Sequence, residues 1–410
     1  MLRFLTCGSV DDGKSTLLGR LLHELGSIPE DTARAIEADS RQFGTQGVAP
    51  DYALLLDGLQ AEREQGITID AAYRYFSNAR RRFIVADAPG HEQYTRNMAT
   101  GASTADATVV LIDASKGVLV QSRRHAYIAS LLRVRHVVVA VNKMDLVDFS
   151  EEAFARIVRD FVAFAERSGI EDVRFVPISA LDGDMIVDRG DRLSWYDGPT
   201  LLQILETAEV SRDLAQAPFR FPIQLVARPT EGRPRGYMGR IESGSVAVGD
   251  AVTVLPSGIT TRIRAIETFD GPQAAAGLHA SVTVVLDDEI DISRGDMLVH
   301  ADAPPAVARS LSATLCWLGD APLDPRRRYL LRHTTREVRA HVERIDDLWN
   351  ISTQRHEPAL ATLARNDIGR IALKLAQPVF AEPYRVNHST GSFILIDETT
   401  NNTVAAGMIQ

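Results

Sequence analysis

The chain has 410 residues, enough for about two to four domains of ordinary size. It carries 45 Lys and Arg residues against 54 Asp and Glu residues, a formal net charge of −9, and 45% of its residues are hydrophobic. This balance is typical of a folded globular protein and excludes a disordered or collagen-like chain. The acidic charge also disfavours nucleic-acid binding, because nucleic-acid phosphates are bound by positive charge.

No apolar stretch approaches the ~20 residues that a membrane-spanning helix needs. The apolar residues before Gly8 are too few for the core of a signal peptide. Two cysteines, Cys7 and Cys316, make no disulfide framework, and each is expected to be a small buried apolar residue. We therefore expect a cytoplasmic protein without a membrane partner.

Residues 1–210 alternate between short apolar runs and amphipathic segments. The runs are typical of buried parallel strands, and the segments between them are typical of connecting helices. The clearest helix is 151–168, and a last helix is expected over 199–209. One face of the helix at 151–168 contains Phe154, Ile157, Val158, Phe161 and Phe164. The expected strands lie in 2–8, 81–90, 107–115, 135–145 and 173–180.

Residues 210–219 are predicted to be a linker, after which the pattern changes. Short β-rich runs follow one another, and glycines separate them at short intervals. This pattern predicts a small β-barrel over 219–305, and a further β-rich unit covers 306–410. The predicted fold class is an α/β domain at 1–210 followed by two small β-barrel domains.

Residues 8–15 fit the pattern G-x-x-x-x-G-K-[ST] between a strand and a helix. Gly8 and Gly13 let the backbone curl so that its N–H groups point at phosphate oxygens, and the helix adds its positive N-terminal end. Lys14 can reach the β- and γ-phosphates, and the Ser15 hydroxyl suits Mg²⁺. The alternative is a chance match in a glycine-rich turn, which the strand and helix on either side disfavour. The predicted phosphate-binding residues are Gly8, Ser9, Val10, Asp11, Asp12, Gly13, Lys14, Ser15 and Thr16.

Three further motifs follow predicted strands in the order of a guanine-nucleotide site. Asp87 ends one strand and can hold Mg²⁺ through water, and Gly90 offers an N–H to the γ-phosphate. Asp145, in the run Asn142, Lys143, Met144, Asp145, can accept the N1–H and the N2 amine of guanine, which adenine lacks. The backbone of Ser179, Ala180 and Leu181 suits the guanine edge. The predicted cofactors are therefore GTP and Mg²⁺.

Together with residues 62–70, EREQGITID, these motifs resemble the G domain of translation-factor-type P-loop GTPases. The resemblance implies that Thr68 closes on Mg²⁺ and the γ-phosphate, so that Ser15, Thr68 and Asp87 form the metal site. Asp12 departs from the elongation-factor pattern, in which a histidine is common at that point of the loop.

The same resemblance also assigns the hydrolytic residues. It implies that His91, directly after the Asp87–Gly90 motif, orients the attacking water. Val10 and Ile67 would flank that histidine as an apolar gate. The catalytic set is then His91, Lys14 and Thr68.

Within this class, the chain resembles the large, GTP-hydrolysing subunits of bacterial sulfate adenylyltransferases over its whole length. Segments outside the nucleotide motifs carry the resemblance, among them WYDGPTLL, DEIDISRGD and TGSFILIDETTNNTVAAGMI. The resemblance implies a heterodimer or larger complex with a small catalytic subunit. That subunit makes adenylyl sulfate and pyrophosphate from ATP and sulfate, the first step of sulfate assimilation, and GTP hydrolysis in this chain drives the reaction.

Two alternatives and one segment stay open at this stage. A translation elongation factor that binds tRNA and the ribosome would share the G domain, but the last third of the chain resembles the sulfate-activating family. A fusion with an adenylylsulfate kinase would need a second G-K-[ST] lysine, which is absent here, and whether the native protein continues into such a domain is not decided.

Segment 182–197 is an insertion-like stretch without an assigned chemical role, apart from packing of Trp195 under the last helix.

Overall fold

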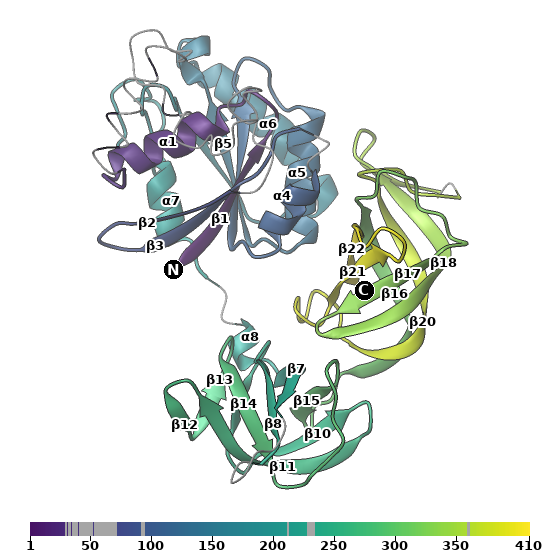
Figure 1. Ribbon diagram of the computed structural model, residues 1–410. Coiled ribbons are helices and arrows are strands. Elements are labelled where there is room, and N and C mark those ends of the chain that lie inside the picture. Colours follow the sequence, from purple (N-terminus) through teal and green to yellow (C-terminus); the bar gives the residue numbers. More distant parts are fainter. Residues whose placement is uncertain are drawn as a thin grey trace. The chain divides into compact units, whose positions relative to one another are not determined.

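Figure 1 shows the computed structural model, which describes residues 1–28, 31, 34, 40, 52, 72–91, 95–210, 213–227, 234–358 and 361–410. The chain divides into two compact units. The first unit is Met1–Val210 with Ile351–Gln354, and the second is Ser211–Asn350 with Arg355–Gln410. The finer division into 1–210, 219–305 and 306–410 stays a prediction.

The first unit is built on a six-stranded sheet in the order β2-β3-β1-β4-β5-β6. Strands β3, β1, β4, β5 and β6 run parallel, whereas β2 is antiparallel to β3. All five predicted strands are present, and β2 has no apolar run because its outer positions are exposed. The bounds are β1 Leu2–Gly8, β2 Ala72–Ser77, β3 Arg82–Asp87, β4 Ala107–Asp113, β5 His136–Asn142 and β6 Val173–Pro177.

Helices lie on both faces of this sheet, with α1 and α7 on one side and α4 and α5 on the other (Figure 1). The predicted helix at 151–168 is α6, which buries Ile157, Phe161 and Phe164 but leaves Phe154 and Val158 half-buried. A one-turn helix, α8, lies within the predicted linker. The bounds are α1 Lys14–Glu24, α4 Thr95–Ala102, α5 Val120–Leu131, the 3₁₀ helix η3 Met144–Val147, α6 Glu151–Ser168, α7 Leu201–Thr207 and α8 Asp213–Gln216.

The first sheet of the second unit closes into a six-stranded antiparallel barrel. Its order is β10-β15-β7-β8-β14-β11, and a β10–β11 pairing joins the two ends. Phe221, Tyr237 and Leu298 are among the apolar side chains that fill the interior. The bounds are β7 Arg220–Ala227, β8 Gly236–Arg240, β9 Ser245–Ala247, β10 Ala251–Leu255, β11 Ile259–Thr268, β12 Gly271–Gln273, β13 Ala275–Gly277, β14 Ser281–Leu286 and β15 Met297–His300.

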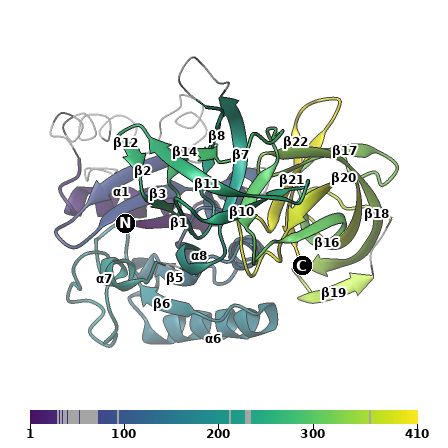
Figure 2. The same cartoon turned by 90° about the horizontal axis from the view of Figure 1, so that it is seen from below.

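The last third of the chain forms a second closed sheet, whose strands wrap around one another in Figure 2. Its order is β17-β21-β22-β16-β20-β18, and a β17–β18 pairing closes it. Trp317, Leu373 and Leu395 lie in its core. The predicted fold class, an α/β domain followed by two β-barrels, is confirmed. The bounds are β16 Ala306–Trp317, β17 Arg328–His333, β18 Arg336–Asn350, β19 Arg355–Pro358, β20 Ile368–Ala381, β21 Ser392–Asp397 and β22 Thr403–Ile409.

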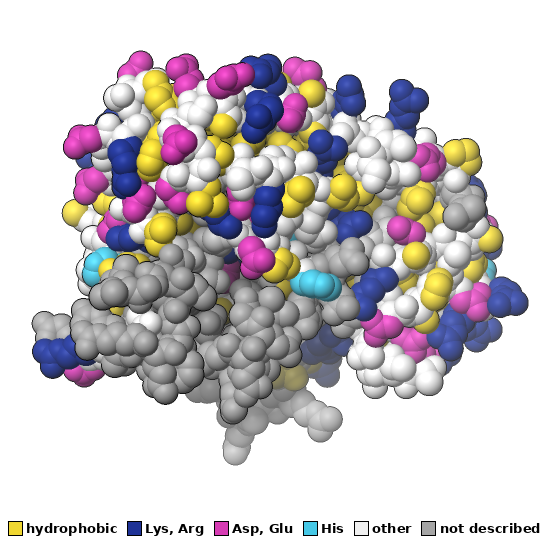
Figure 3. Space-filling view, turned by 90° about the horizontal axis from the view of Figure 1, so that it is seen from above, with side chains coloured by type: hydrophobic (Ala, Val, Ile, Leu, Met, Phe, Trp, Pro, Cys, Tyr) yellow, Lys and Arg dark blue, Asp and Glu magenta, His cyan; other side chains and the backbone are white. Residues whose placement is uncertain are grey.

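Two surface features bear on the class of partner. Within the described residues, no helix is long and apolar enough to cross a membrane. On the face shown in Figure 3, Lys and Arg side chains are interspersed with Asp and Glu side chains. The described part of that face therefore offers no continuous basic surface of the kind that binds nucleic-acid phosphates.

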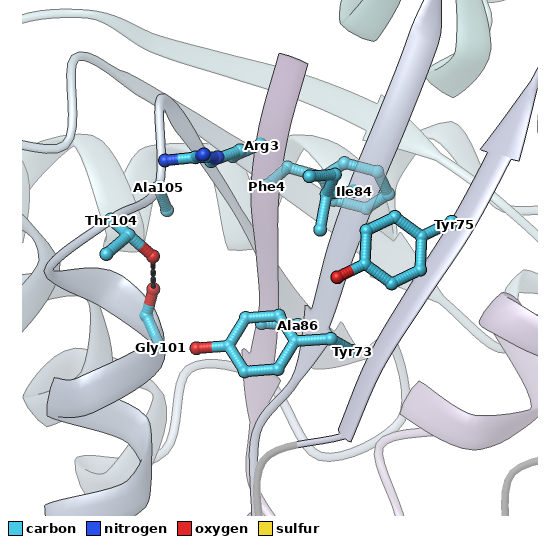
Figure 4. A pocket seen from close by; sticks show the side chains of 9 residues that line it. All are labelled: Arg3, Phe4, Tyr73, Tyr75, Ile84, Ala86, Gly101, Thr104 and Ala105. Atoms are coloured by element: carbon cyan, nitrogen blue, oxygen red, sulfur yellow. Dashed lines mark hydrogen bonds between the residues drawn. The ribbon is translucent and has the colours of Figure 1, made fainter. Parts of the chain in front are cut away.

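A cavity of about 280 Å³ lies on the sheet of the first unit, beside the end of α4 (Figure 4). The exposed rings of Tyr73 and Tyr75 on β2 form one side, and Thr104 lies opposite. Arg3, at the start of β1, forms another part of the wall. Because the phosphate motif follows the other end of β1, this cavity is separate from the predicted nucleotide site.

An ion pair between Arg220 on β7 and Glu382 just after β20 joins the two barrels. Arg220 Nη2 lies 2.8 Å from Glu382 Oε1, Arg220 Nε lies 3.1 Å from Oε2, and the side chains are 3% and 12% exposed. We expect Arg220→Met to lower the free energy of unfolding by about 3 kcal/mol, because it leaves a largely buried carboxylate without its positively charged partner. Urea unfolding measures the change.

The matched control is Arg240→Met, which removes a pair with Glu242 whose arginine side chain is 46% exposed. This change should cost less than about 1 kcal/mol. Equal losses in the two variants would contradict a stabilising role for the buried pair.

Candidate functional site

The predicted phosphate loop connects the end of β1 to the start of α1, both purple in Figure 1. Asp11 and Gly13 have positive φ angles of 65° and 90°, so the backbone curls as the motif requires. A Cβ atom at Gly13 would collide with the side-chain amide of Asn142. Glycine is therefore needed at position 13 both for its conformation and for the approach of Asn142.

Lys14 lies inside the loop that precedes it. Its Nζ donates to Ser9 O at 2.7 Å and to Gly8 O at 3.5 Å, and the residue is 7% exposed. A Cβ atom at Gly90 would lie 2.5 Å from Lys14 Nζ and 2.9 Å from Ser9 O. The structure thus brings the Asp87–Gly90 motif directly against the phosphate loop. Burial lowers the pKa of Lys14, and the nearby carboxylates Asp87 and Asp12 oppose that shift.

Asp12, the residue that departs from the elongation-factor pattern, is bonded within the loop. Its Oδ2 accepts the N–H of Ser9 at 2.6 Å, and the residue is 1% exposed. Burial raises the pKa of Asp12, whereas Lys14 and the Ser9 hydrogen bond lower it. The carboxylate therefore fixes the conformation of the loop from inside.

Asp87 and Ser15 provide oxygen donors of the kind that Mg²⁺ prefers. Asp87 ends β3, is 2% exposed, and accepts a hydrogen bond from Thr6 Oγ1 at 2.8 Å. Ser15 and Thr16 are half-buried in the first turn of α1. Among the described residues there is no group of three or more His, Cys, Asp or Glu side chains arranged to hold a metal. This donor set fits an ion that takes one or two protein oxygens and completes its shell with phosphate and water.

Asn142, at the end of β5, joins the phosphate loop to the predicted guanine loop. Its Nδ2 donates to Asp12 O at 2.8 Å, and its Oδ1 accepts the N–H of Ala180 at 2.9 Å. Both groups of one amide are used, and the residue is 1% exposed. Asn142 therefore positions two loops that are far apart in the sequence.

Asp145, the predicted guanine ligand, is half-buried next to Ser179. Ser179 Oγ donates to Asp145 Oδ1 at 2.8 Å, which holds one carboxylate oxygen in place. Lys143 instead pairs with Asp113, with Nζ 2.9 Å from Oδ2. Burial alone would raise the pKa of Asp113, but hydrogen bonds from Ser115 and Lys143 outweigh it and the pKa is lowered. Leu181 is 37% exposed at the rim of the loop.

The remaining predicted residues are only partly described. His91 is half-buried directly after the Asp87–Gly90 motif, and Val10 is half-buried in the phosphate loop. Thr68 and Ile67 lie outside the described residues, as does the whole segment 62–70. The roles of these residues stay predictions.

Two residues that the sequence motifs do not contain also support the loops. Arg20 on α1 donates through Nε to Ala180 O at 3.4 Å, and a second guanidinium nitrogen bonds Leu181 O. His125 on α5 accepts the N–H of Gly8 through Nδ1 at 3.2 Å. In the sequence each is only a polar residue within a predicted helix, which does not identify a partner 117 or 160 residues away.

Burial lowers the pKa of His125 to about 3, and the charges of Lys14 and Arg124 act in the same direction. The unfolded chain therefore binds a proton between about pH 6.5 and pH 3 that the folded chain does not bind. Stability from neutral His125 is complete above pH 6.5 and is lost as the pH falls. We expect His125→Asn to reduce the pH dependence of the unfolding free energy below pH 6.5 by up to about 1.4 kcal/mol per pH unit.

Urea unfolding between pH 7 and pH 5 measures this dependence. His341→Asn, at an exposed position on β18, is the matched control and should keep the wild-type dependence. An unchanged pH dependence in His125→Asn would rule out this role of His125.

Three family models match successive parts of the chain. Residues 1–214 match the family of the elongation factor Tu GTP binding domain, residues 237–299 match elongation factor Tu domain 2, and residues 310–410 match the GTP-eEF1A C-terminal domain-like family. A crystal structure of sup35 complexed with GMPPNP is 24% identical with a TM-score of 0.45, over 100% of this chain and 93% of that chain.

Curated relatives cover the whole chain at higher identity. Sulfate adenylyltransferase subunit 1 of Chromobacterium violaceum is 54% identical over 410 residues, which are 100% of this chain and 86% of the relative. The protein of the same name from Alteromonas mediterranea is 51% identical over 409 residues, with the same coverage of both chains. These names describe one subunit of an enzyme with more than one subunit. The chain belongs to the sulfate adenylyltransferase subunit 1 family, and its first domain is a GTP-binding domain of the elongation factor Tu type.

Proposed function

We propose that this chain hydrolyses GTP and thereby drives a partner catalytic subunit to form adenylyl sulfate and pyrophosphate from ATP and sulfate. The observation that carries the proposal is the convergence of the phosphate loop, Asn142 and the loop at 179–181 in a chain with full-length subunit 1 relatives. No described feature favours the alternative of a tRNA-carrying elongation factor.

The phosphates are proposed to bind in the loop at 8–15. Its N–H groups and the N-terminal end of α1 attract negative charge, and Lys14 adds a buried cation. Gly90 approaches Lys14 closely enough for its backbone to sense the γ-phosphate. This closeness supports Gly90 as the point where the state of the nucleotide is read.

Guanine is proposed to bind Asp145 and the backbone of 179–181. The Asp145 carboxylate accepts the N1–H and N2 amine, and Ser179 orients it by donating to Oδ1. Adenine offers neither donor to this carboxylate, so its binding would leave a desolvated charge unpaired.

Mg²⁺, when bound, would supply positive charge that offsets the charge of the nucleotide phosphates. We propose that Ser15 and Asp87 hold it, with Thr68 closing over it. His91 is proposed to orient the attacking water through a hydrogen bond. Lys14 stabilises the negative charge that develops on the β- and γ-phosphate oxygens as the bond breaks.

Coupling to the partner needs an element whose conformation depends on the γ-phosphate. Sulfate activation is strongly uphill, so the nucleotide state must change affinity or geometry at the partner's site. We propose that the segments at 66–70 and 90–100 form part of that contact surface, because the family resemblance implies that they sense the γ-phosphate. Residues 66–70 and 92–94 lie outside the described residues.

Replacement of Asp145 by Asn should reverse the base preference. We expect Asp145→Asn to weaken GDP binding by about 10²-fold, because an amide donor then faces the guanine donors. Xanthosine diphosphate, which carries a carbonyl at position 2, should bind the variant better than GDP does. Binding titrations with the two nucleotides test this, with Asp148→Asn in the same loop as the control. Wild-type GDP affinity in Asp145→Asn would refute the guanine assignment.

The coupling itself is tested with the partner subunit, ATP, sulfate and Mg²⁺. We expect GTP to raise the yield of adenylyl sulfate and pyrophosphate with the wild-type chain. Lys14→Ala should abolish that increase while the reaction with ATP alone survives. The control is Lys374→Ala, at an exposed position on β20, which should keep the increase. Equal yields with and without GTP in the wild type would contradict the coupling, and the chain would then be a GTPase that does not drive this reaction.

A further inference from the structure

Segment 182–197, to which the sequence assigns no chemistry, begins as part of the guanine loop. Ser179 N–H donates to Asp184 O at 3.3 Å, and Gly183 N–H donates to Ser179 O at 2.8 Å. Asp184 is 4% exposed and is therefore buried under the loop. A displacement of residues 182–184 would therefore move Ser179.

The other end of the segment holds the loop that contains Asp145. Trp195 Nε1 donates to Phe149 O at 2.8 Å. Phe149 N–H in turn donates to Met144 O at 2.8 Å and so closes the turn around Asp145. Phe149 has a positive φ angle of 54°, which a non-glycine residue adopts only where its surroundings fix it. Segment 182–197 thus contacts both loops of the proposed guanine site.

Ser179 has one hydroxyl proton and two carboxylates within reach. Its Oγ lies 2.8 Å from Asp145 Oδ1 and 3.3 Å from Asp182 Oδ2. A serine hydroxyl donates one hydrogen bond, so the two carboxylates compete for it. If the Ser179 hydroxyl donated to Asp182 instead, Asp145 would lose the hydrogen bond that orients its carboxylate.

Arg192, within the same segment, occupies the competing carboxylate. Its Nη1 lies 2.8 Å from Asp182 Oδ2, and its Nη2 lies 2.6 Å from Asp184 Oδ2. Its guanidinium also lies over the Phe149 ring, 4.8 Å from the ring centre. One planar side chain therefore pairs with both acidic residues and packs on the loop that follows Asp145.

We propose that Arg192 is a positioning residue for guanine recognition. Because Arg192 pairs with Asp182, the Ser179 hydroxyl is left to donate its hydrogen bond to Asp145. The inference rests on the proposed binding of guanine by Asp145. Because guanine makes two contacts with that carboxylate and hypoxanthine makes one, the orientation of Asp145 determines the preference for GDP over IDP. A residue that only stabilised the fold would affect both nucleotides equally.

The experiment measures the affinities of the full chain for GDP and IDP. Arg192→Gln should weaken GDP binding by about tenfold and IDP binding by less than about threefold, so the GDP/IDP preference falls. Addition of Asp182→Ala to Arg192→Gln removes the competing carboxylate and should restore the preference to within about twofold of wild type.

The matched control is Arg189→Gln, because Arg189 lies in the same segment but donates to the carbonyls of Gly198 and Tyr196. It should keep the wild-type preference. Arg192→Lys keeps the charge but loses the planar fork, and it should give an intermediate GDP/IDP preference. It replaces Arg192→Gln in the experiment if that variant does not fold.

Three results separate the possible failures. An equal loss of GDP and IDP affinity in Arg192→Gln would overturn the positioning role. Failure of the added Asp182→Ala to restore the preference would overturn the competition for the Ser179 proton. A wild-type chain that does not prefer GDP over IDP would instead overturn the guanine assignment, and with it this inference.

Discussion

The nucleotide site depends on one side-chain amide, that of Asn142. The phosphate loop and the loop at 179–181 follow strands β1 and β6, which are not neighbours in the sheet. Asn142 ends β5 and reaches both, donating to Asp12 O and accepting from Ala180 N–H. A carboxylate at this position would face the carbonyl of Asp12 without a donor, and a Cβ atom at position 13 would collide with the Asn142 amide. The relative position of the proposed phosphate and base sites is thus fixed by a group with both a donor and an acceptor.

Local sequence patterns predicted the strands and the long helix of the first unit. The apolar runs became β1, β3, β4, β5 and β6, and the helix at 151–168 has the predicted bounds. Strand β2 could not be found in the same way, because its alternating pattern lacks an apolar run. Thr68 and Ile67 lie outside the described residues, so their predicted roles stay predictions.

The supporting contacts were not predictable, for a physical reason. Gly8 and His125 are 117 residues apart, and Arg20 and Ala180 are 160 residues apart. Such contacts are set by the order of strands and by helix rotation, which a local pattern does not contain. Arg192 illustrates the same limit, since a charged residue in a polar segment is typical of a solvated surface. Its function depends on Asp182 and Asp184 being brought together by the turn before it.

The distribution of lysine nevertheless carries information about the site. The chain has only four lysines, and three of them, Lys14, Lys116 and Lys143, belong to the nucleotide-binding unit. Lys143 and Lys116 lie 2.9 and 3.9 Å from the same oxygen of Asp113.

Apart from Lys374, the other basic residues are arginines, whose planar fork suits two-contact pairs such as Arg220 with Glu382. Lys14 has a different task, because its nitrogen must fit between Ser9 O and the backbone of Gly90. A compact ammonium fits there and a guanidinium does not. Lys14 therefore occupies a place where a small point charge is required, between the predicted phosphate loop and Gly90.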